Sequence, residues 1–331
     1  MIPPKAPPSQ AIDWRRDCRE ALSEPAELDR RLALRAETAS GEASARFPLR
    51  APEPFLSRVR PGDPDDPLLR QVLPSDAELE EAEGFVRDPV GDLQVATGGG
   101  LLQKYRGRAL LIATGACPIH CRYCFRRHFP YGEQATADPT ELAATLRTMP
   151  DVQELILSGG DPLMLSDARL GALIAAAESV PHLRRLRIHT RMPVAVPARI
   201  TDALCRHLGT GRLRPVVVVH CNHPDEIDDE VRGALARLAS AGVTLLNQSV
   251  LLRGVNDDAD TLVRLSETLF AAGVLPYYLH LLDRAAGTAH FEVPESEARE
   301  IHRRCSARLP GYLLPRLARE TAGEPGKRVL C

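Results

Sequence analysis

The sequence predicts an α/β protein, an incomplete TIM-type barrel of six strand–helix units, (βα)6, preceded by an N-terminal helical extension. From residue 109 onward, short apolar runs alternate with segments of helical periodicity. Successive apolar runs lie about thirty residues apart with a helix between them, so they cannot pair as hairpins and should form a parallel sheet. Six units are fewer than the eight of a closed barrel. We therefore expect an open barrel.

The first part of the chain, residues 1–95, predicts a helical and irregular region that wraps the barrel. Trp14 to Glu37 has the periodicity of one or two amphipathic helices. The stretch from Phe47 to Pro74 is rich in Pro, Gly and Asp and should be largely irregular. The string Pro74-Ser-Asp-Ala-Glu-Leu79 is typical of a helix start.

The barrel is expected within residues 96–290, and a C-terminal segment, residues 291–331, follows it. Helical periodicity is clearest at Ala168–Val180, Glu226–Ala239 and Asp258–Ala271. Functional residues of parallel α/β sheets lie at the carboxyl ends of the strands, so the loops after the strands are the places to search. The six predicted strands are Ala109–Thr114, Glu154–Ser158, Leu186–Thr190, Pro215–Cys221, Thr244–Leu251 and Leu275–Leu281.

Composition limits the partners that this protein can have. The chain carries 42 Lys+Arg against 44 Asp+Glu, a formal net charge of −2, and so lacks the basic excess typical of nucleic-acid binding. Residues 1–10 contain no apolar signal segment, and no run approaches the ~18–20 apolar residues needed to cross a membrane. We therefore expect a cytoplasmic protein that acts on small molecules, with no nucleic-acid or membrane partner.

Three cysteines lie close together after the first predicted strand, in the string Cys117-Pro-Ile-His-Cys121-Arg-Tyr-Cys124. Thiolates at this spacing can hold three irons of a 4Fe–4S cluster and leave the fourth iron without a protein ligand. An open coordination position is typical of a catalytic metal site. A zinc knuckle is the alternative, with His120 or His128 as fourth ligand, although the sequence has no second Cys or His pair at zinc-type spacing. The loop therefore favours an enzyme.

Two further features stand out from their surroundings. Ser158-Gly-Gly-Asp161 ends the second predicted strand, where glycines let a ligand approach the backbone and the acid can accept a hydrogen bond from an ammonium group. Among all the basic residues, only Lys5, Lys104 and Lys327 are lysines. Arginine stays protonated and cannot do the chemistry of a primary amine. Since Lys5 lies in a Pro-rich tail, such chemistry would fall to Lys104 or Lys327.

These strings resemble a known family. CPIHCRYC followed by SGGDP resembles the radical S-adenosylmethionine superfamily. The longer strings CRYCFRRHFPY, LILSGGDPL, HCNHPDEI, NQSVLLRGVND and GEPGK are similar to lysine 2,3-aminomutases, most of all to the short subgroup that makes (R)-β-lysine for modification of elongation factor P. The resemblance implies that Cys117, Cys121 and Cys124 ligate a 4Fe–4S cluster whose open iron binds S-adenosylmethionine. The residues implied to bind S-adenosylmethionine are Ser158, Gly159, Gly160, Asp161, His220 and Gln248.

The resemblance implies a second cofactor, pyridoxal 5′-phosphate. Migration of an amino group between adjacent carbons needs an imine, which this cofactor supplies when it condenses with the substrate. The family places its cofactor-binding lysine in the string Gly323-Glu-Pro-Gly-Lys327, so Lys327 is implied to be catalytic. Arg108 and Lys104 are implied to contact the cofactor phosphate. A frayed terminus and a solvated strand edge are the alternatives for these two segments.

Substrate contacts are also implied by the resemblance. Arg126 would hold the lysine carboxylate, and Asp283 would hold the distal ε-ammonium group. The second acid of the longer family members is an aspartate, whereas this chain has Glu320, which keeps the charge and changes the reach. Two acids at the distal end disfavour a glutamate substrate, because its side chain would be repelled.

The predicted function is isomerisation of L-α-lysine to (R)-β-lysine through a 5′-deoxyadenosyl radical, with an electron donor such as flavodoxin or ferredoxin. The resemblance links the product to elongation factor P, to which a separate β-lysine ligase would attach it, and it allows a homo-oligomer. An aminomutase for arginine or glutamate is the alternative within the family. A non-catalytic zinc-binding or cluster-binding module is the alternative from another class.

Overall fold

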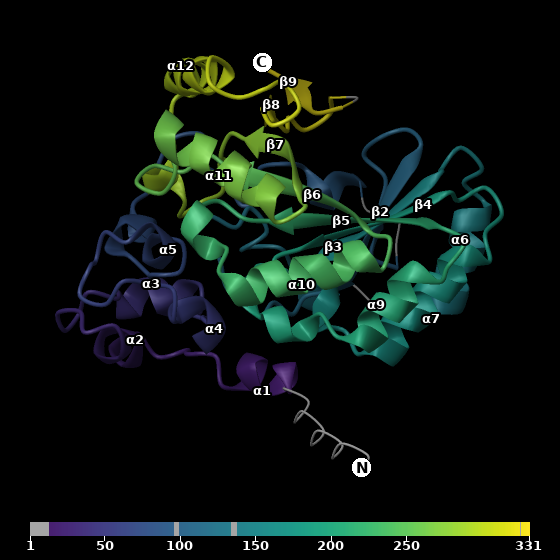
Figure 1. Ribbon diagram of the computed structural model, residues 1–331, viewed down its shortest axis with the longest axis horizontal. Coiled ribbons are helices and arrows are strands. Elements are labelled where there is room, and N and C mark those ends of the chain that lie inside the picture. Colours follow the sequence, from purple (N-terminus) through teal and green to yellow (C-terminus); the bar gives the residue numbers. More distant parts are fainter. Residues whose placement is uncertain (1–12, 96–98, 134–137, 325) are drawn as a thin grey trace, which may run out of the picture.

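One nine-stranded sheet forms the centre of the computed structural model, which describes residues 13–95, 99–133, 138–324 and 326–331 (Figure 1). The strands are β1 (Leu101–Leu102), β2 (Arg108–Thr114), β3 (Glu154–Gly159), β4 (Arg185–Thr190), β5 (Arg214–His220), β6 (Thr244–Val250), β7 (Leu275–His280), β8 (Arg316–Arg319) and β9 (Arg328–Val329). They follow one another in chain order, with every pair from β2 to β8 parallel. Strands β1 and β9 pair antiparallel at the two edges. The fold is therefore an open, partial TIM-type barrel.

The six predicted barrel strands are present as β2 to β7, with nearly the predicted bounds. The prediction missed β8, a seventh parallel strand that pairs with β7. Only its two central residues, Leu317 and Ala318, are buried, so the run is too short and too polar to give an apolar pattern.

Helices connect successive parallel strands and cover the outer face of the sheet (Figure 1). The segments predicted at residues 168–180, 226–239 and 258–271 form the helices α7 (Asp167–Glu178), α10 (Asp229–Ser240) and α11 (Ala259–Ala271). Five of the connecting helices begin after an Asp, Ser or Thr side chain that accepts a hydrogen bond from a first-turn amide, the usual N-cap. The helices are α6 (Pro139–Arg147), α7 (Asp167–Glu178), α8 (Met192–Ala195), α9 (Asp202–Gly209), α10 (Asp229–Ser240), α11 (Ala259–Ala271) and α12 (Glu295–Ser306), with 3-10 turns η3 (Tyr131–Glu133), η4 (Pro162–Met164), η5 (Pro197–Arg199), η6 (Pro224–Glu226) and η7 (Ala289–Phe291).

The N-terminal region is built from short helices that lie together at one side of the barrel (Figure 1). They are α1 (Trp14–Arg19), α2 (Pro25–Arg31), α3 (Gly41–Arg46), α4 (Glu53–Leu56) and α5 (Pro67–Arg70), followed by the 3-10 turns η1 (Asp76–Leu79) and η2 (Asp92–Val95). The helix start predicted at Pro74 is only the turn η1, capped by Ser75. Trp14 and Phe55 belong to the same buried cluster as the strand residue Leu155. The region therefore shares its core with the barrel. Lys5 lies outside the described residues.

The C-terminal segment closes one edge of the sheet with helix α12 and the hairpin of β8 and β9. In the hairpin register Arg319 is the partner of Arg328, so the chain turns back between residues 320 and 327. This turn brings Glu320 and Lys327 to facing positions beside β7. Pro325 of the GEPGK string lies outside the described residues.

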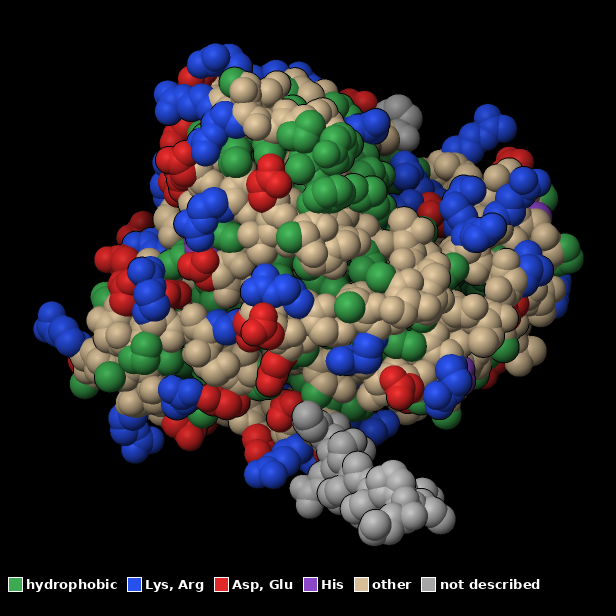
Figure 2. Space-filling view, viewed as in Figure 1, with side chains coloured by type: hydrophobic (Ala, Val, Ile, Leu, Met, Phe, Trp, Pro, Cys, Tyr) green, Lys and Arg blue, Asp and Glu red, His purple; other side chains and the backbone are tan. Residues whose placement is uncertain are grey.

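Basic and acidic side chains are interspersed over the face of the molecule that Figure 2 shows. In the described part of the chain, no helix combines the length and the apolar character required to span a bilayer.

Candidate active site

A cavity of about 250 Å³ lies along the inner face of the sheet and reaches the carboxyl ends of its strands. Every site residue that the resemblance to a family implies lines this one cavity. These residues are Lys104, Arg108, Cys117, Cys121, Cys124, Arg126, Ser158, Gly159, Gly160, Asp161, His220, Gln248, Asp283, Glu320 and Lys327.

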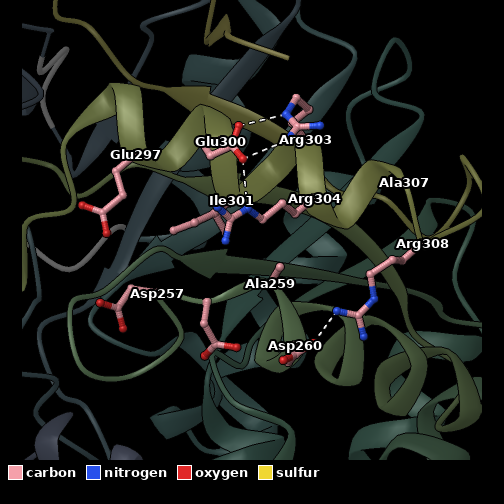
Figure 3. Close-up of a pocket in the computed structure, with 11 residues that line it drawn as sticks. Asp257, Ala259, Asp260, Glu297, Glu300, Ile301, Arg303, Arg304, Ala307 and Arg308 are labelled. Atoms are coloured by element: carbon pink, nitrogen blue, oxygen red, sulfur yellow. Dashed lines mark hydrogen bonds and ion pairs between the residues drawn. The ribbon is translucent and has the colours of Figure 1, made fainter.

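A larger hollow of about 620 Å³ lies at the surface between the segment that leads into α11 and the helix α12 (Figure 3). Most of its charged side chains are paired, either with one another or with Arg253, which binds Asp257 and Glu297. Glu300 binds Arg303 and Arg304, and Arg308 binds Asp260. Most charges of this surface hollow are satisfied locally, and the hollow holds none of the predicted site residues. The inner cavity is therefore the candidate site.

The N-terminal region fixes the cysteine loop from outside. Arg122, between the second and third cysteines, is fully buried and pairs with Glu78 at 2.6 Å. It also donates a hydrogen bond of 2.8 Å to the carbonyl of Phe47. His120 and His128, the candidate fourth ligands of a zinc site, each place one ring nitrogen against a backbone carbonyl, at 2.8 and 3.0 Å respectively. The wrapping region therefore helps to set the position of the thiols.

The three thiols are half-buried, unpaired and turned to the cavity. Burial, reinforced by the neighbouring thiolates, raises the pKa of Cys124 to about 11 and that of Cys117 well above its usual value. Thiolates in this setting need a bound cation to stay ionised. Among the described residues, no three His, Cys, Asp or Glu side chains are grouped tightly enough for a single metal ion. A 4Fe–4S cluster binds each cysteine at a different iron, so the donor set fits a cluster.

Two glycines let the turn after β3 pack directly against the cysteine loop. Gly159 has φ +115°, and a Cβ there would lie 2.6 Å from the carbonyl oxygen of Thr114. A Cβ on Gly160 would lie 2.8 Å from the carbonyl carbon of Gly115. The amide of Gly160 donates to Thr114 O at 2.7 Å. The glycines therefore allow a close backbone approach, as predicted, but in this structure the approaching backbone is that of the segment leading into the cysteine loop.

Gly160→Ala is expected to displace the cysteine loop and to reduce cluster loading. The new methyl group would overlap the backbone of Gly115 and Ala116, and overpacking of this kind costs about 1–3 kcal/mol. Iron and acid-labile sulfide per chain, measured after anaerobic reconstitution, should fall below the wild-type values. Gly132→Ala is the matched control, because nothing lies within 4 Å of a Cβ there. Full loading of Gly160→Ala would contradict the role assigned to this contact.

Asp161 ties the same turn to the end of β4. Its two carboxylate oxygens accept hydrogen bonds of 2.8 Å from the hydroxyl of Thr190 and further bonds from the amides of Leu163, Arg191 and Met192. Direct binding of a ligand amine by this carboxylate stays a prediction, because both oxygens already have protein donors.

His220 and Gln248 face each other at the ends of β5 and β6, where they are partners in the strand register. Their Nε2 atoms are 2.6 Å apart. Burial lowers the pKa of His220 to about 3, so its imidazole is neutral. The pair presents neutral polar groups to the cavity, which suits hydroxyl groups of a sugar.

Lys327 reaches the cavity from the C-terminal hairpin. Its Nζ lies 3.5 Å from Glu320 Oε2 and 3.2 Å from His280 Nε2, and 5.2 Å from the ring centre of Tyr278. Burial lowers the pKa of Lys327, and the negative charges of Glu320 and Asp283 oppose that shift. The residue is therefore a partly buried amine with several contacts in the cavity, rather than part of a frayed terminus.

A series of ion pairs links Lys327 to Arg126 through Glu320, Lys104 and Asp92. Lys104 donates to Glu320 at 3.0 Å and lies 2.5 Å from Asp92 Oδ1. Asp92 also accepts a hydrogen bond of 2.7 Å from Nε of Arg126. Nη1 of the same guanidinium group donates to the hydroxyl of Ser158 at 3.0 Å. Lys104 is thus paired with two acids, and the phosphate contact expected for it stays a prediction.

Arg108 and Asp283 keep their polar groups more available. Arg108 stacks on Tyr105 at 4.6 Å, and its Nε is buried without a hydrogen-bond partner among the described residues. Burial and the charge of Glu320 raise the pKa of Asp283 to about 7. The guanidinium of Arg108 is suited to bind an anion, and the carboxyl group of Asp283 is suited to bind a cation.

Several cavity residues were missed by the sequence analysis. Arg187, His189 and Arg191 belong to β4 or follow it at once, and Tyr278 and His280 belong to β7, so position on a strand could have indicated them. Asp92 lies in the wrapping region, and nothing in its local sequence marks it.

Comparison with known proteins places the chain in a family. A family model described as the radical SAM superfamily matches residues 111–265. The chain is 49% identical to the L-lysine 2,3-aminomutase of Escherichia coli (strain K12), over 96% of this chain and 94% of the relative. It is 37% identical to the L-lysine 2,3-aminomutase of Clostridium subterminale, over 95% of this chain and 77% of the relative. In fold it is also similar to a radical SAM methyltransferase from Sphaerobacter thermophilus, with TM-score 0.48, 15% identity and coverage of 66% and 68% of the two chains. The chain belongs to the L-lysine 2,3-aminomutase family of the radical SAM superfamily.

Proposed function

We propose that this protein converts L-α-lysine to (R)-β-lysine with a 4Fe–4S cluster, S-adenosylmethionine and pyridoxal 5′-phosphate. The observation that carries the proposal is that one cavity joins the three-cysteine loop to the partly buried amine of Lys327. The cluster and S-adenosylmethionine supply a carbon radical that abstracts hydrogen, and pyridoxal phosphate supplies the π system through which nitrogen migrates. Such a radical must be kept from water, and a cavity inside a barrel, with Asp92 of the wrapping region in its lining, suits this need.

The protein side of the pyridoxal phosphate site would be Lys327 and Arg108. Lys327 bonds covalently to the cofactor, which requires a neutral amine, and burial favours that form. Arg108 holds the phosphate through a guanidinium whose Nε has no partner among the described residues. Lys104 balances Asp92 and Glu320 instead. Of the two predicted phosphate contacts, the Nε of Arg108, without a partner in the described part of the chain, therefore supports Arg108 more strongly than Lys104.

Charge balance in the cavity favours lysine as the substrate. Asp92, Asp283 and Glu320 lie in the cavity with Lys104, Arg126 and Lys327. The other cationic side chains of the lining are engaged elsewhere, since Arg187 pairs with Glu154, Arg191 pairs with Glu226, and Arg108 is assigned to the phosphate. When Lys327 is no longer an ammonium ion, the acids lack one positive partner. The ε-ammonium group of lysine restores the balance beside Asp283 and Glu320, while Arg126 holds the substrate carboxylate.

The substrate is tested by anaerobic incubation of reconstituted enzyme with dithionite, S-adenosylmethionine, pyridoxal phosphate and single amino acids, followed by chiral chromatography. (R)-β-Lysine from L-lysine is the expected product. β-Arginine or β-glutamate as the main product would assign another substrate. A fully folded chain that binds zinc in place of iron and turns over none of them would overturn the enzymatic function.

Lysine isomerisation is expected to lose efficiency as the pH falls through about 7. Asp283 has a pKa of about 7 in the substrate-free cavity, so below that pH it is protonated and cannot pair with an ammonium group. The value of kcat/KM should fall up to about tenfold per pH unit below 7. Asp283→Asn should have a much lower kcat/KM that no longer shows this dependence. An unchanged acidic limb in Asp283→Asn would remove Asp283 from the substrate site.

We also propose that the β-lysine serves modification of elongation factor P in the cytoplasm, where a separate ligase attaches it. The support is the likeness of the whole chain to the short subgroup with that role. A flavodoxin or ferredoxin would supply the electron, and a homo-oligomer is compatible with the chain. Deletion of the gene should remove β-lysine from elongation factor P, and added (R)-β-lysine should restore it.

A further inference from the structure

Arg191 is a buried cation in direct contact with one of the three loop cysteines. Its Nη1 donates hydrogen bonds of 2.8 Å to Cys121 Sγ and of 2.8 Å to the hydroxyl oxygen of Tyr123. The side chain is 5% exposed. The guanidinium therefore lies against the sulfur in a dry environment, where charges interact strongly.

The position of Arg191 is fixed from three sides. Nη2 donates to Glu226 at 3.0 Å and to Gln71 at 2.7 Å, and both partners are fully buried. The backbone amide of Arg191 donates to Asp161 at 2.8 Å. Because Glu226 is an acid, it is the fixed counter-ion of Arg191.

The contact is particular to one cysteine. Within the described ranges, no charged side chain donates a hydrogen bond to the sulfur of Cys117 or Cys124, whereas Cys121 has Arg191. The side chains of Arg126 and Arg127 act on Cys124 only through space, so among the described residues Cys121 is the loop thiol that a cationic side chain hydrogen-bonds directly.

We propose that Arg191, with Glu226 as its counter-ion, sets the reduction potential of the cluster that this loop holds. The inference rests on the cluster of the proposed function. When a one-electron donor such as dithionite or a reduced flavodoxin reduces the cluster, the added negative charge spreads over its sulfurs, including that of Cys121. A fixed cation that hydrogen-bonds this sulfur stabilises the reduced form and raises the potential. Glu226 opposes the effect, so the pair tunes the tendency of the cluster to pass its electron to the sulfonium of S-adenosylmethionine.

The test is a redox titration of full-length, reconstituted protein, followed by electron paramagnetic resonance of the reduced cluster. Arg191→Gln should shift the midpoint potential to a more negative value, and Arg191→Lys should shift it less. Glu226→Gln should shift it to a more positive value. Shifts of opposite sign from two neighbouring residues are not expected from a general loosening of the loop.

Arg199→Lys is the matched control. Arg199 is also fully buried, but it donates to the carbonyls of Leu163 and Leu165 and pairs with Asp167. Among the described residues it donates no hydrogen bond to a loop cysteine, so its variant should keep the wild-type potential. Equal potentials in wild type, Arg191→Gln and Glu226→Gln, with full iron and sulfide content, would overturn the inference. If Arg191→Gln loses the cluster, its potential cannot be measured, and an unchanged potential in Glu226→Gln is then enough to overturn the inference. A wild-type chain that binds no iron or sulfide would overturn the proposed function, and the inference with it.

Discussion

Lys327→Arg is expected to abolish lysine isomerisation and to leave no covalently bound pyridoxal phosphate. Arginine keeps a positive charge beside Glu320, but it stays protonated and cannot form the covalent bond that a neutral amine forms. Loss of a covalent catalytic group lowers kcat by roughly a thousandfold or more. Borohydride reduction of the wild-type holoenzyme, followed by mass analysis of peptides, should find the cofactor on Lys327. The variant should carry none.

Lys104→Arg is the control for this experiment. Lys104 also lines the cavity and contacts the same Glu320, but its nitrogen is already held by Asp92 and by the carbonyl of Val90. The variant keeps the positive charge, so it should retain the label on Lys327 and activity within about tenfold of wild type. A cofactor found on Lys104, or normal turnover by Lys327→Arg, would contradict the assignment.

Strand β8 explains how a residue near the end of the sequence reaches the centre of the barrel. It extends the parallel sheet past β7, and the antiparallel strand β9 then brings the chain back along it. Glu320 and Lys327 lie at the two ends of the turn between them. The element that the sequence analysis missed is therefore the one that positions Lys327.

The strands and the cysteine loop were predictable because their signals are local. A parallel strand covered on both faces gives a continuous apolar run, as in β5, and the spacing of three cysteines is visible in one short string. The order of the strands then places the loop at the carboxyl edge of the sheet. The resemblance to a family supplied Lys327, which local sequence alone would assign to a loose terminus.

The polar network was not predictable because its partners are far apart in the chain. Lys104 joins Asp92 to Glu320, which is 216 positions away. Arg191 likewise joins Cys121 to Gln71, 120 positions away. Such pairs form only after the wrapping region and the C-terminal hairpin have docked on the barrel. Sequence patterns can indicate a charged residue, but its partner is set by tertiary packing.

Cys124→Ala is expected to remove the iron–sulfur cluster and all lysine turnover. A triad that already leaves one iron open would hold only two irons after this change, which is too few for stable binding. Iron and sulfide content should fall close to zero, and reductive cleavage of S-adenosylmethionine by dithionite should stop. Lys327 lies in the other half of the cavity, so covalent binding of pyridoxal phosphate should persist.

Cys305→Ala shows whether this loss belongs to the loop rather than to any buried thiol. Cys305 is also buried, and burial raises its pKa to about 11, as it does for Cys124, but its sulfur faces the carbonyl of Ala259 in the helical layer. Its variant should keep full cluster content. Paired with Lys327→Arg, which should keep the cluster and lose the covalent cofactor, Cys124→Ala separates the two halves of the site. Loss of both cofactors from either variant would mean that the cavity loads them as one unit.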